Sequence, residues 1–151
     1  MLPSSHLAAG YILAYLFYSV GFIHGLVFWL VILASVLIDI DYFVKYMHRE
    51  LFTHTPAFWL VVFTPLVLWN NELVIVLLAI MLHFSMDMVD GGIMVFYPFS
   101  KKDYGLKLLP ELESNSPINF LREYVSNVRM VIVEVVIICL AVLLAVVNYF
   151  D

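Results

Sequence analysis

The most constraining feature of this sequence is its uncharged beginning, since residues 1–38 contain no Asp, Glu, Lys or Arg. The apolar part of this stretch, residues 7–38, would form a helix about 48 Å long at 1.5 Å per residue. One bilayer crossing needs only about 20 residues. Gly21 and Gly25 lie near the middle, so we expect two helices joined around residues 19–25, the first of them short or re-entrant. The stretch is too long for the apolar core of a signal peptide, and it lacks a basic start.

The composition of the 151-residue chain also indicates a membrane location. Hydrophobic residues make up 64% and charged residues 13%, against about 45–50% and about 25% in soluble domains. A chain of this length has too little interior to hide so much apolar surface. The net charge of −5 provides no basic field for nucleic acid, and the single Cys139 excludes an intramolecular disulfide framework. We therefore expect an integral membrane protein that binds no nucleic acid.

Three further apolar segments follow the first stretch, at residues 56–69, 73–89 and 130–150. They are separated by polar or proline-containing sequence, which breaks helices. The sequence therefore predicts an all-α polytopic membrane helix bundle of about five membrane segments. We expect one integral membrane domain over residues 1–151, with polar loops at 39–55 and 90–129.

The distribution of basic residues predicts the orientation of the bundle. All seven Lys and Arg lie in the two polar loops, 39–55 and 90–129. These loops flank a helical hairpin and so share one side, which the excess of basic residues places in the cytoplasm. The turn at residues 70–72 contains no Lys or Arg and falls outside. We expect a protein of the cell (inner or plasma) membrane.

Side chains that can bind metals lie at the segment ends on the predicted cytoplasmic face. They are four histidines and four aspartates that the sequence separates by up to 84 positions. This convergence is the main functional signal in the chain and needs no motif match. The eight residues are His6, Asp39, Asp41, His48, His54, His83, Asp87 and Asp90.

Two pairs within this group have alternative interpretations. His83 and Asp87 are four residues apart, so they share a helical face and can chelate one ion; a hydrogen-bonded pair inside a bundle is the alternative. Asp39 and Asp41 are two apart and do not face the same way, so we expect one ligand from this pair, although both can also simply end a helix in water. Ionisable residues inside a membrane are costly and mark functional sites, which favours the metal hypothesis.

Other ionisable residues differ in how strongly their positions indicate a site. His54 precedes Thr55-Pro56, a helix N-cap followed by proline at the first helical position, so His54 is positioned rather than mobile. His48-Arg49 can be either part of the site or solvated charges. His24 falls on the opposite face and receives no role. Glu134 lies one turn inside the last apolar segment and is interpreted as interfacial.

Mixed histidine and carboxylate ligands suit Zn²⁺ first, and also Mn²⁺ or Fe²⁺. The expected metal ligands are His6, Asp39, His54, His83 and Asp87, with His48 as an additional candidate. They are numerous enough for one or two ions, and two ions form a clamp for phosphoester hydrolysis. Arg49, or alternatively Lys45, is expected to hold a phosphoryl group. Asp41 or Asp90 is expected to move a proton. Because the candidate ligands lie at one membrane face, beside the lipid headgroups, the expected partner is a membrane lipid.

Five blocks spaced over roughly residues 1–100 form a recognisable pattern. They are His6 with Gly10, Ile38–Asp41, His48-Arg49, Thr53–Thr55, and His83–Asp87 running on to Gly92 and Pro98-Phe99. This pattern resembles the YdjM-like (LexA-regulated) family of membrane-bound metal-dependent hydrolases. Tyr42, Glu50 and Thr55 stand where the family usually shows histidine, glycine and serine. The resemblance implies a metal-dependent hydrolase. Its ligand pattern is similar to that of zinc-dependent phospholipase C, which implies a phospholipid or lipid-phosphate substrate.

The alternative function is non-enzymatic metal binding by a transporter or sensor. A transporter places its ligands near the bilayer midplane, often in broken helices. Here the candidate ligands crowd one interface, which favours an enzyme that acts on lipid headgroups. A purely structural membrane component would require the whole set of histidines and aspartates to be coincidental.

Overall fold

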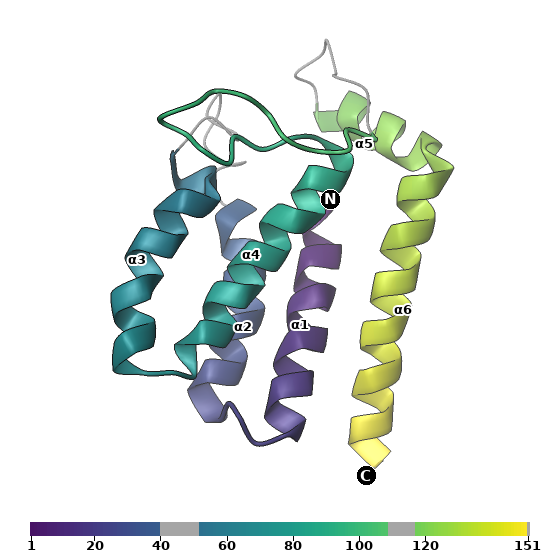
Figure 1. Cartoon of the computed structure of the whole chain (residues 1–151). Coiled ribbons are helices and arrows are strands. Elements are labelled where there is room, and N and C mark those ends of the chain that lie inside the picture. Colours follow the sequence, from purple (N-terminus) through teal and green to yellow (C-terminus); the bar gives the residue numbers. More distant parts are fainter. Residues whose placement is uncertain (40–51, 109–116, 151) are drawn as a thin grey trace.

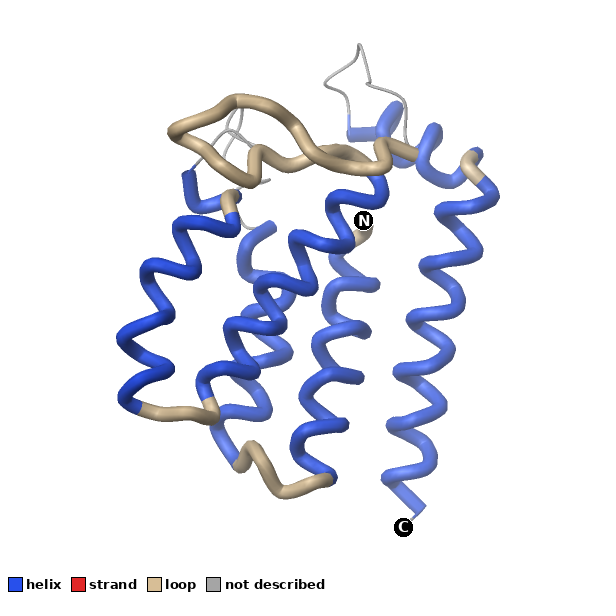
Figure 2. Tube along the Cα trace, in the orientation of Figure 1, coloured by secondary structure: helices blue, strands red, loops and turns tan. Residues whose placement is uncertain are grey.

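A computed structural model describes residues 1–39, 52–108 and 117–150, and these residues form a helical bundle. Regular β-strands are absent from this part of the chain, where the only extended pairing is an isolated bridge between Ile93 and Tyr104. The all-α class predicted from the sequence is therefore confirmed. Figures 1 and 2 show long helices packed side by side, with a loop and a short helix across one end.

The uncharged stretch divides into two helices, as its length required. α1 spans Pro3–Ser19 and α2 spans Gly25–Leu37. Pro3 occupies the first helical position, where its missing N–H removes no hydrogen bond. Gly21 turns the chain between the helices with a φ of 72°, a conformation that costs glycine little. The two helices therefore run in opposite directions, and His6 and Asp39 lie at the same end of the bundle.

The next two helices form a hairpin in the middle of the chain. A short 3₁₀ turn at Phe52–His54 precedes α3, which spans Pro56–Trp69. α4 spans Leu73–Asp90. The Asn70 side chain accepts a hydrogen bond from the Glu72 backbone N–H (3.0 Å) in the turn between them. Glu72 in turn accepts one from the His24 backbone N–H (3.2 Å), so both helical turns lie at the end away from Asp39.

The polar region 90–129, predicted as a loop, contains a helix of its own. α5 spans Pro117–Ser126, and α6 spans Val128–Phe150. The sequence interpretation missed α5 because its ten residues mix apolar and charged side chains; of residues 121–126, the structure buries Tyr124. Before α5, residues 91–108 pass over the end of α4 (Figures 1 and 2). The backbone N–H of Leu108 donates to the Val89 carbonyl (3.1 Å) and fixes this loop there.

α1 and α4 are the central helices of the bundle. α1 packs against α2, α4 and α6, whereas α4 also contacts α2 and α3. Gly10 of α1 lies directly against Ser35 of α2, where a Cβ atom on residue 10 would meet Ser35 Oγ at 2.2 Å and Ser35 Cβ at 2.6 Å. Only glycine permits this approach, so Gly10 sets how closely α1 and α2 pack.

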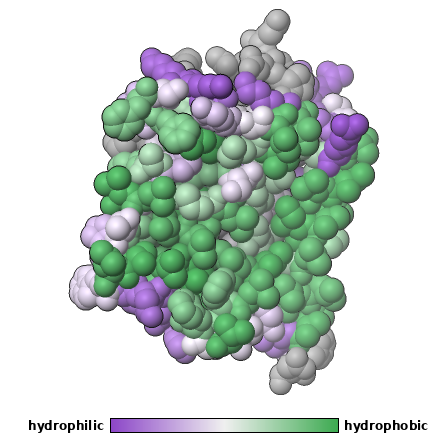
Figure 3. Space-filling view, in the orientation of Figure 1, coloured by the Kyte–Doolittle hydropathy of each residue, from purple (hydrophilic) through white to green (hydrophobic). Residues whose placement is uncertain are grey.

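The surface of the bundle is suited to lipid. Figure 3 shows a broad apolar belt on the face in view, with hydrophilic residues gathered toward two ends. Among the described helices, α4 and the Val128–Tyr149 part of α6 are long and apolar enough to cross a membrane, whereas α2 and α3 are apolar but shorter. Only 11% of the α6 segment is buried inside the protein, so most of its apolar surface faces outward.

The contact between Gly10 and Ser35 predicts the effect of adding a single methyl group. Gly10→Ala is expected to lower the melting temperature in detergent, because overpacking costs about 1–3 kcal/mol and exceeds the helix preference of Ala over Gly, about 1 kcal/mol. The double variant Gly10→Ala/Ser35→Gly removes the atoms that clash and should recover most of the loss. A Gly10→Ala protein with the same melting temperature as the wild type would contradict the close packing of α1 and α2.

Candidate metal centre

Four side chains from three helical elements meet at one end of the bundle. One ligand atom each from His6, Asp39, His83 and Asp87 lies within 4.8 Å of the other three. His6, His83 and Asp87 are buried, with at most 1% of each residue exposed, and Asp39 has 14% of its side chain exposed. The structure thus brings together residues that the sequence separates by up to 81 positions.

The Asp87 carboxylate is the centre of this group, because three imidazoles approach it. Asp87 Oδ2 lies 3.1 Å from His54 Nε2 and 3.4 Å from His83 Nε2, and Oδ1 lies 3.2 Å from His6 Nε2. Asp39 closes the opposite side, with Oδ1 3.6 Å from His83 Nε2 and Oδ2 4.0 Å from His6 Nε2. Nitrogen and oxygen donors therefore alternate around a small shared space.

His83 is oriented by the helix beside it. Its Nδ1 lies 2.8 Å from the backbone carbonyl of Ser35, which can only accept, so Nδ1 carries the proton and donates. Nε2 then faces Asp87 and Asp39 with a free lone pair. Metal-bound histidines are commonly fixed in this way by a hydrogen bond at the other ring nitrogen. No sequence pattern predicts this contact, because the partner is a backbone atom.

Several buried polar atoms of this group have no hydrogen-bond partner among the described residues. They are both ring nitrogens of His6, Asp39 Oδ2 and His83 Nε2. A buried donor or acceptor that forms no hydrogen bond costs about 1–3 kcal/mol. Buried carboxylates are normally paired or bound to metal. A divalent cation would satisfy one ring nitrogen of His6, His83 Nε2 and the Asp39 carboxylate, since each residue of the group offers one ligand atom. The donor set of two imidazoles and two carboxylates therefore fits such an ion, and the type of donor suits Zn²⁺, Mn²⁺ or Fe²⁺.

His54 lies beside the four-residue group rather than within it. The start of α3 holds it in place, and its ring centroid lies 5.7 Å from that of His83. Its contact with Asp87 suits either of two roles, a ligand for a second ion or a partner that orients the Asp87 carboxylate. The sequence-based choice of His54 as a metal ligand stays a prediction.

The other predicted site residues are divided between described and undescribed parts of the chain. Asp90 is buried one turn beyond Asp87. The amino group of Met1 contacts the carboxylates of Asp87 and Asp90, and it lies 3.1 Å from Asp87 Oδ1. Asp90 is not a member of the four-residue group. The remaining candidates, Asp41, His48 and Arg49, lie outside the described residues.

A second buried carboxylate, Glu134 of α6, has partners that the sequence interpretation did not identify. Only 5% of Glu134 is exposed. It accepts hydrogen bonds from the Leu2 backbone N–H (2.9 Å) and from the hydroxyls of Ser5 and Tyr124. The position of Glu134 inside a long apolar segment was the sequence signal that could have indicated a buried acid. Its hydrogen-bond partners come from the α1 and α5 regions, which only the fold brings next to α6.

Glu134 and its donors hold the N-terminal end of α1 against α5 and α6. Burial, together with the hydrogen bond to Glu134, raises the pKa of the Tyr124 hydroxyl above its ordinary value. Tyr124 therefore stays protonated and remains a donor. Because His6 follows Ser5 directly, this second cluster also fixes the helix that carries a candidate ligand.

His24 lies at the opposite end of the bundle, as expected. It is exposed, and its Nδ1 lies 3.9 Å from Glu72 Oε1. It has no part in the buried group and so provides a natural comparison for the other histidines.

Comparisons with known proteins agree with the membrane character of the chain. The family model described as YdjM inner membrane protein matches residues 1–150. Neither a curated protein nor a solved structure matches the chain.

The Glu134 cluster predicts a stability effect away from the metal ligands. Tyr124→Phe leaves a buried carboxylate without one of its donors, so we expect a loss of about 1–3 kcal/mol, measured as a lower melting temperature in detergent. Tyr18→Phe is the matched control, because Tyr18 is 49% exposed. Equal melting of the two variants would contradict a structural role for the Tyr124 hydroxyl.

Proposed function

The chain belongs to the YdjM inner membrane protein family, and from this premise and its buried histidine–aspartate group we propose that it is a metal-dependent hydrolase. The proposed substrate is a phospholipid or lipid-phosphate ester at the cytoplasmic face of the membrane. The observation that carries the proposal is a set of buried atoms with no hydrogen-bond partner among the residues that the structure describes: ring nitrogens of His6 and His83 and one carboxylate oxygen of Asp39. Such atoms are costly to bury unless a ligand satisfies them.

The proposed ion is Zn²⁺, with Mn²⁺ or Fe²⁺ as alternatives, held by His6, Asp39, His83 and Asp87. A bound divalent ion supplies Lewis acidity, which activates water and stabilises charge on a phosphoryl oxygen. His54 orients the Asp87 carboxylate or holds a second ion.

The chain's own residues supply the remaining proposed roles. Asp90 is placed one helical turn from Asp87, where a carboxylate outside the ligand group can accept and return a proton. Asp41 is the alternative for that role. Arg49 is proposed to hold the anionic phosphoryl group, since a guanidinium donates two parallel hydrogen bonds to phosphate.

The proposed orientation places the metal centre at the cytoplasmic interface. In this arrangement α1, α2, α3, α4 and α6 are the five membrane segments. The candidate ligands come from the start of α1, the end of α2, the start of α3 and the end of α4. Antiparallel order brings these four positions to one end, next to the loop that contains Lys101 and Lys102. The positive-inside rule assigns that end to the cytoplasm.

A second candidate function is metal binding without catalysis, as in a sensor or transporter. One observation favours it: His6, His83 and Asp87 are almost completely enclosed, whereas a catalytic site keeps one coordination position open to water or substrate. The 14% exposure of the Asp39 side chain favours the hydrolase, because it leaves one side of the group accessible.

Metal content tests the proposed ligand set. His83→Ala is expected to weaken Zn²⁺ binding more than about 100-fold, because it removes a ligand rather than a group that only orients one. The measurement is metal analysis of detergent-purified protein after dialysis against a zinc buffer. His24→Ala, a histidine change at the other end, should keep the wild-type metal content. Loss of metal in both variants, or in neither, would argue against the buried group.

Turnover of lipid phosphoesters by the same samples separates the two functions. Arg49→Ala should retain metal and lose hydrolysis, since a guanidinium is not a ligand, whereas His83→Ala should lose both. A metal-loaded wild-type protein that hydrolyses none of a broad phospholipid and lipid-phosphate panel, and instead moves the ion across liposomes, would replace the hydrolase with the transporter.

The orientation is tested by labelling a cysteine in the turn between α3 and α4. In a Cys139→Ala background, Asn71→Cys is expected to react with an impermeant thiol reagent added from outside the inner membrane. Labelling of this variant only from the cytoplasmic side of inverted vesicles would reverse the orientation and place the metal centre on the outer face.

A further inference from the structure

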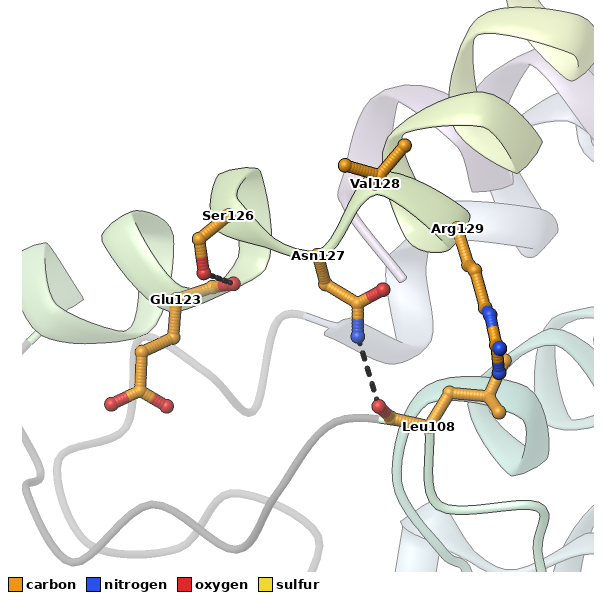
Figure 4. A pocket seen from close by; sticks show the side chains of 6 residues that line it. All are labelled: Leu108, Glu123, Ser126, Asn127, Val128 and Arg129. Carbon is orange, nitrogen blue, oxygen red and sulfur yellow. Dashed lines mark hydrogen bonds between the residues drawn. The ribbon is translucent and has the colours of Figure 1, made fainter.

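The elbow between α5 and α6 contains a surface groove that the proposed catalytic function does not use. Its volume is about 710 Å³, and its lining residues are Leu108, Glu123, Ser126, Asn127, Val128 and Arg129. None of them belongs to the candidate metal-binding group. The groove is drawn from close by in Figure 4.

The groove is built around Asn127, the residue between the two helices. The Asn127 side-chain amide donates to the Leu108 carbonyl (2.9 Å) and ties the elbow to the loop over α4. Its backbone N–H donates to the carbonyl of Glu123 (3.2 Å) and its backbone carbonyl accepts from Val131 (3.1 Å). These bonds belong to both helices, so the elbow has a fixed shape.

Two side chains of opposite charge flank Asn127. Figure 4 shows Glu123, Asn127 and Arg129 pointing toward the same side of the elbow, with Asn127 between the two charged groups. Neither Glu123 nor Arg129 forms an ion pair with any residue that the structure describes. The groove therefore has an exposed carboxylate and an exposed guanidinium in its wall, and within the described part of the chain neither is neutralised by the other.

The groove lies at the start of a helix that is long and apolar enough to cross a membrane. The apolar segment of α6 begins at Val128, and the Val128 side chain is largely exposed in the groove wall. On α5, Leu121 and Val125 are also exposed. Apolar side chains beside charged ones are typical of an amphipathic element at the level of the lipid headgroups.

We propose that this elbow groove binds the headgroup of a zwitterionic glycerophospholipid such as phosphatidylethanolamine. The phosphate lies against Arg129, because a guanidinium matches phosphate geometry. The ammonium lies against Glu123, and the first carbons of the acyl chains lie along Val128. A lipid is the chosen occupant because this ligand needs one anionic and one cationic group joined to an apolar chain. The site is separate from the metal centre and does not depend on the proposed hydrolase.

Lipid binding by the full chain in detergent tests the proposal. Native mass spectrometry measures the retention of phosphatidylethanolamine and of phosphatidylglycerol, which has the phosphate but no amine. Arg129→Gln should weaken retention of both lipids about tenfold, the effect of losing a charged hydrogen bond. Glu123→Gln should leave phosphatidylglycerol unchanged and remove the preference for phosphatidylethanolamine. Arg129→Lys, which keeps the charge, should retain more lipid than Arg129→Gln.

Matched variants distinguish the groove from general effects. Arg122→Gln changes the neighbouring arginine, which does not line the groove, and should bind both lipids like the wild type. His83→Ala should also keep the lipid, so failure of the metal proposal would leave this one standing. Equal retention by Arg129→Gln and Arg122→Gln, or an unchanged lipid preference in Glu123→Gln, would overturn the proposed site.

Discussion

Burial of the Asp87 carboxylate inside an apolar bundle is the constraint on which the rest of this structure depends. A carboxylate removed from water is very costly unless compensating groups surround it. Here three imidazoles approach Asp87 within 3.4 Å. They come from α1, from the turn before α3 and from α4 itself, so these elements must meet at one end. The positions of these helix ends therefore depend on the need to compensate the buried Asp87 carboxylate.

A second buried carboxylate extends the same constraint to the remaining helices. Glu134 of α6 accepts hydrogen bonds from the start of α1 and from Tyr124 of α5. α1 thus lies between two acidic centres, with Ser5 bonded to one and His6 directed to the other. At its middle, Gly10 lets α1 approach α2 closely enough for a backbone carbonyl of α2 to orient His83. Packing and polar contacts therefore act together on the candidate metal centre.

The arrangement separates polar chemistry from the apolar belt along the helices. The candidate ligands lie near the ends of the described helices, rather than in broken helices at their midpoints as in many transporters. In the proposed orientation such a site lies near one membrane interface, close to the lipid headgroups on which the proposed hydrolase would act. The elbow groove lies near the same end, at the start of α6, and offers paired charges of a kind suited to a headgroup. Both proposals therefore depend on the same sorting of charge along the bundle.

The sequence by itself determined that this is an all-helical membrane protein and which residues could form its site. An uncharged stretch too long for one crossing predicted the α1–α2 hairpin, and the i, i+4 spacing predicted that His83 and Asp87 share a face. It could not reveal that Glu134 is buried against Tyr124, that α5 forms, or that the Ser35 carbonyl orients His83. Periodicity and composition indicate which segments form helices and which of their faces are apolar. Contacts between distant segments depend on helix spacing and backbone atoms, and these are decided only when the helices pack.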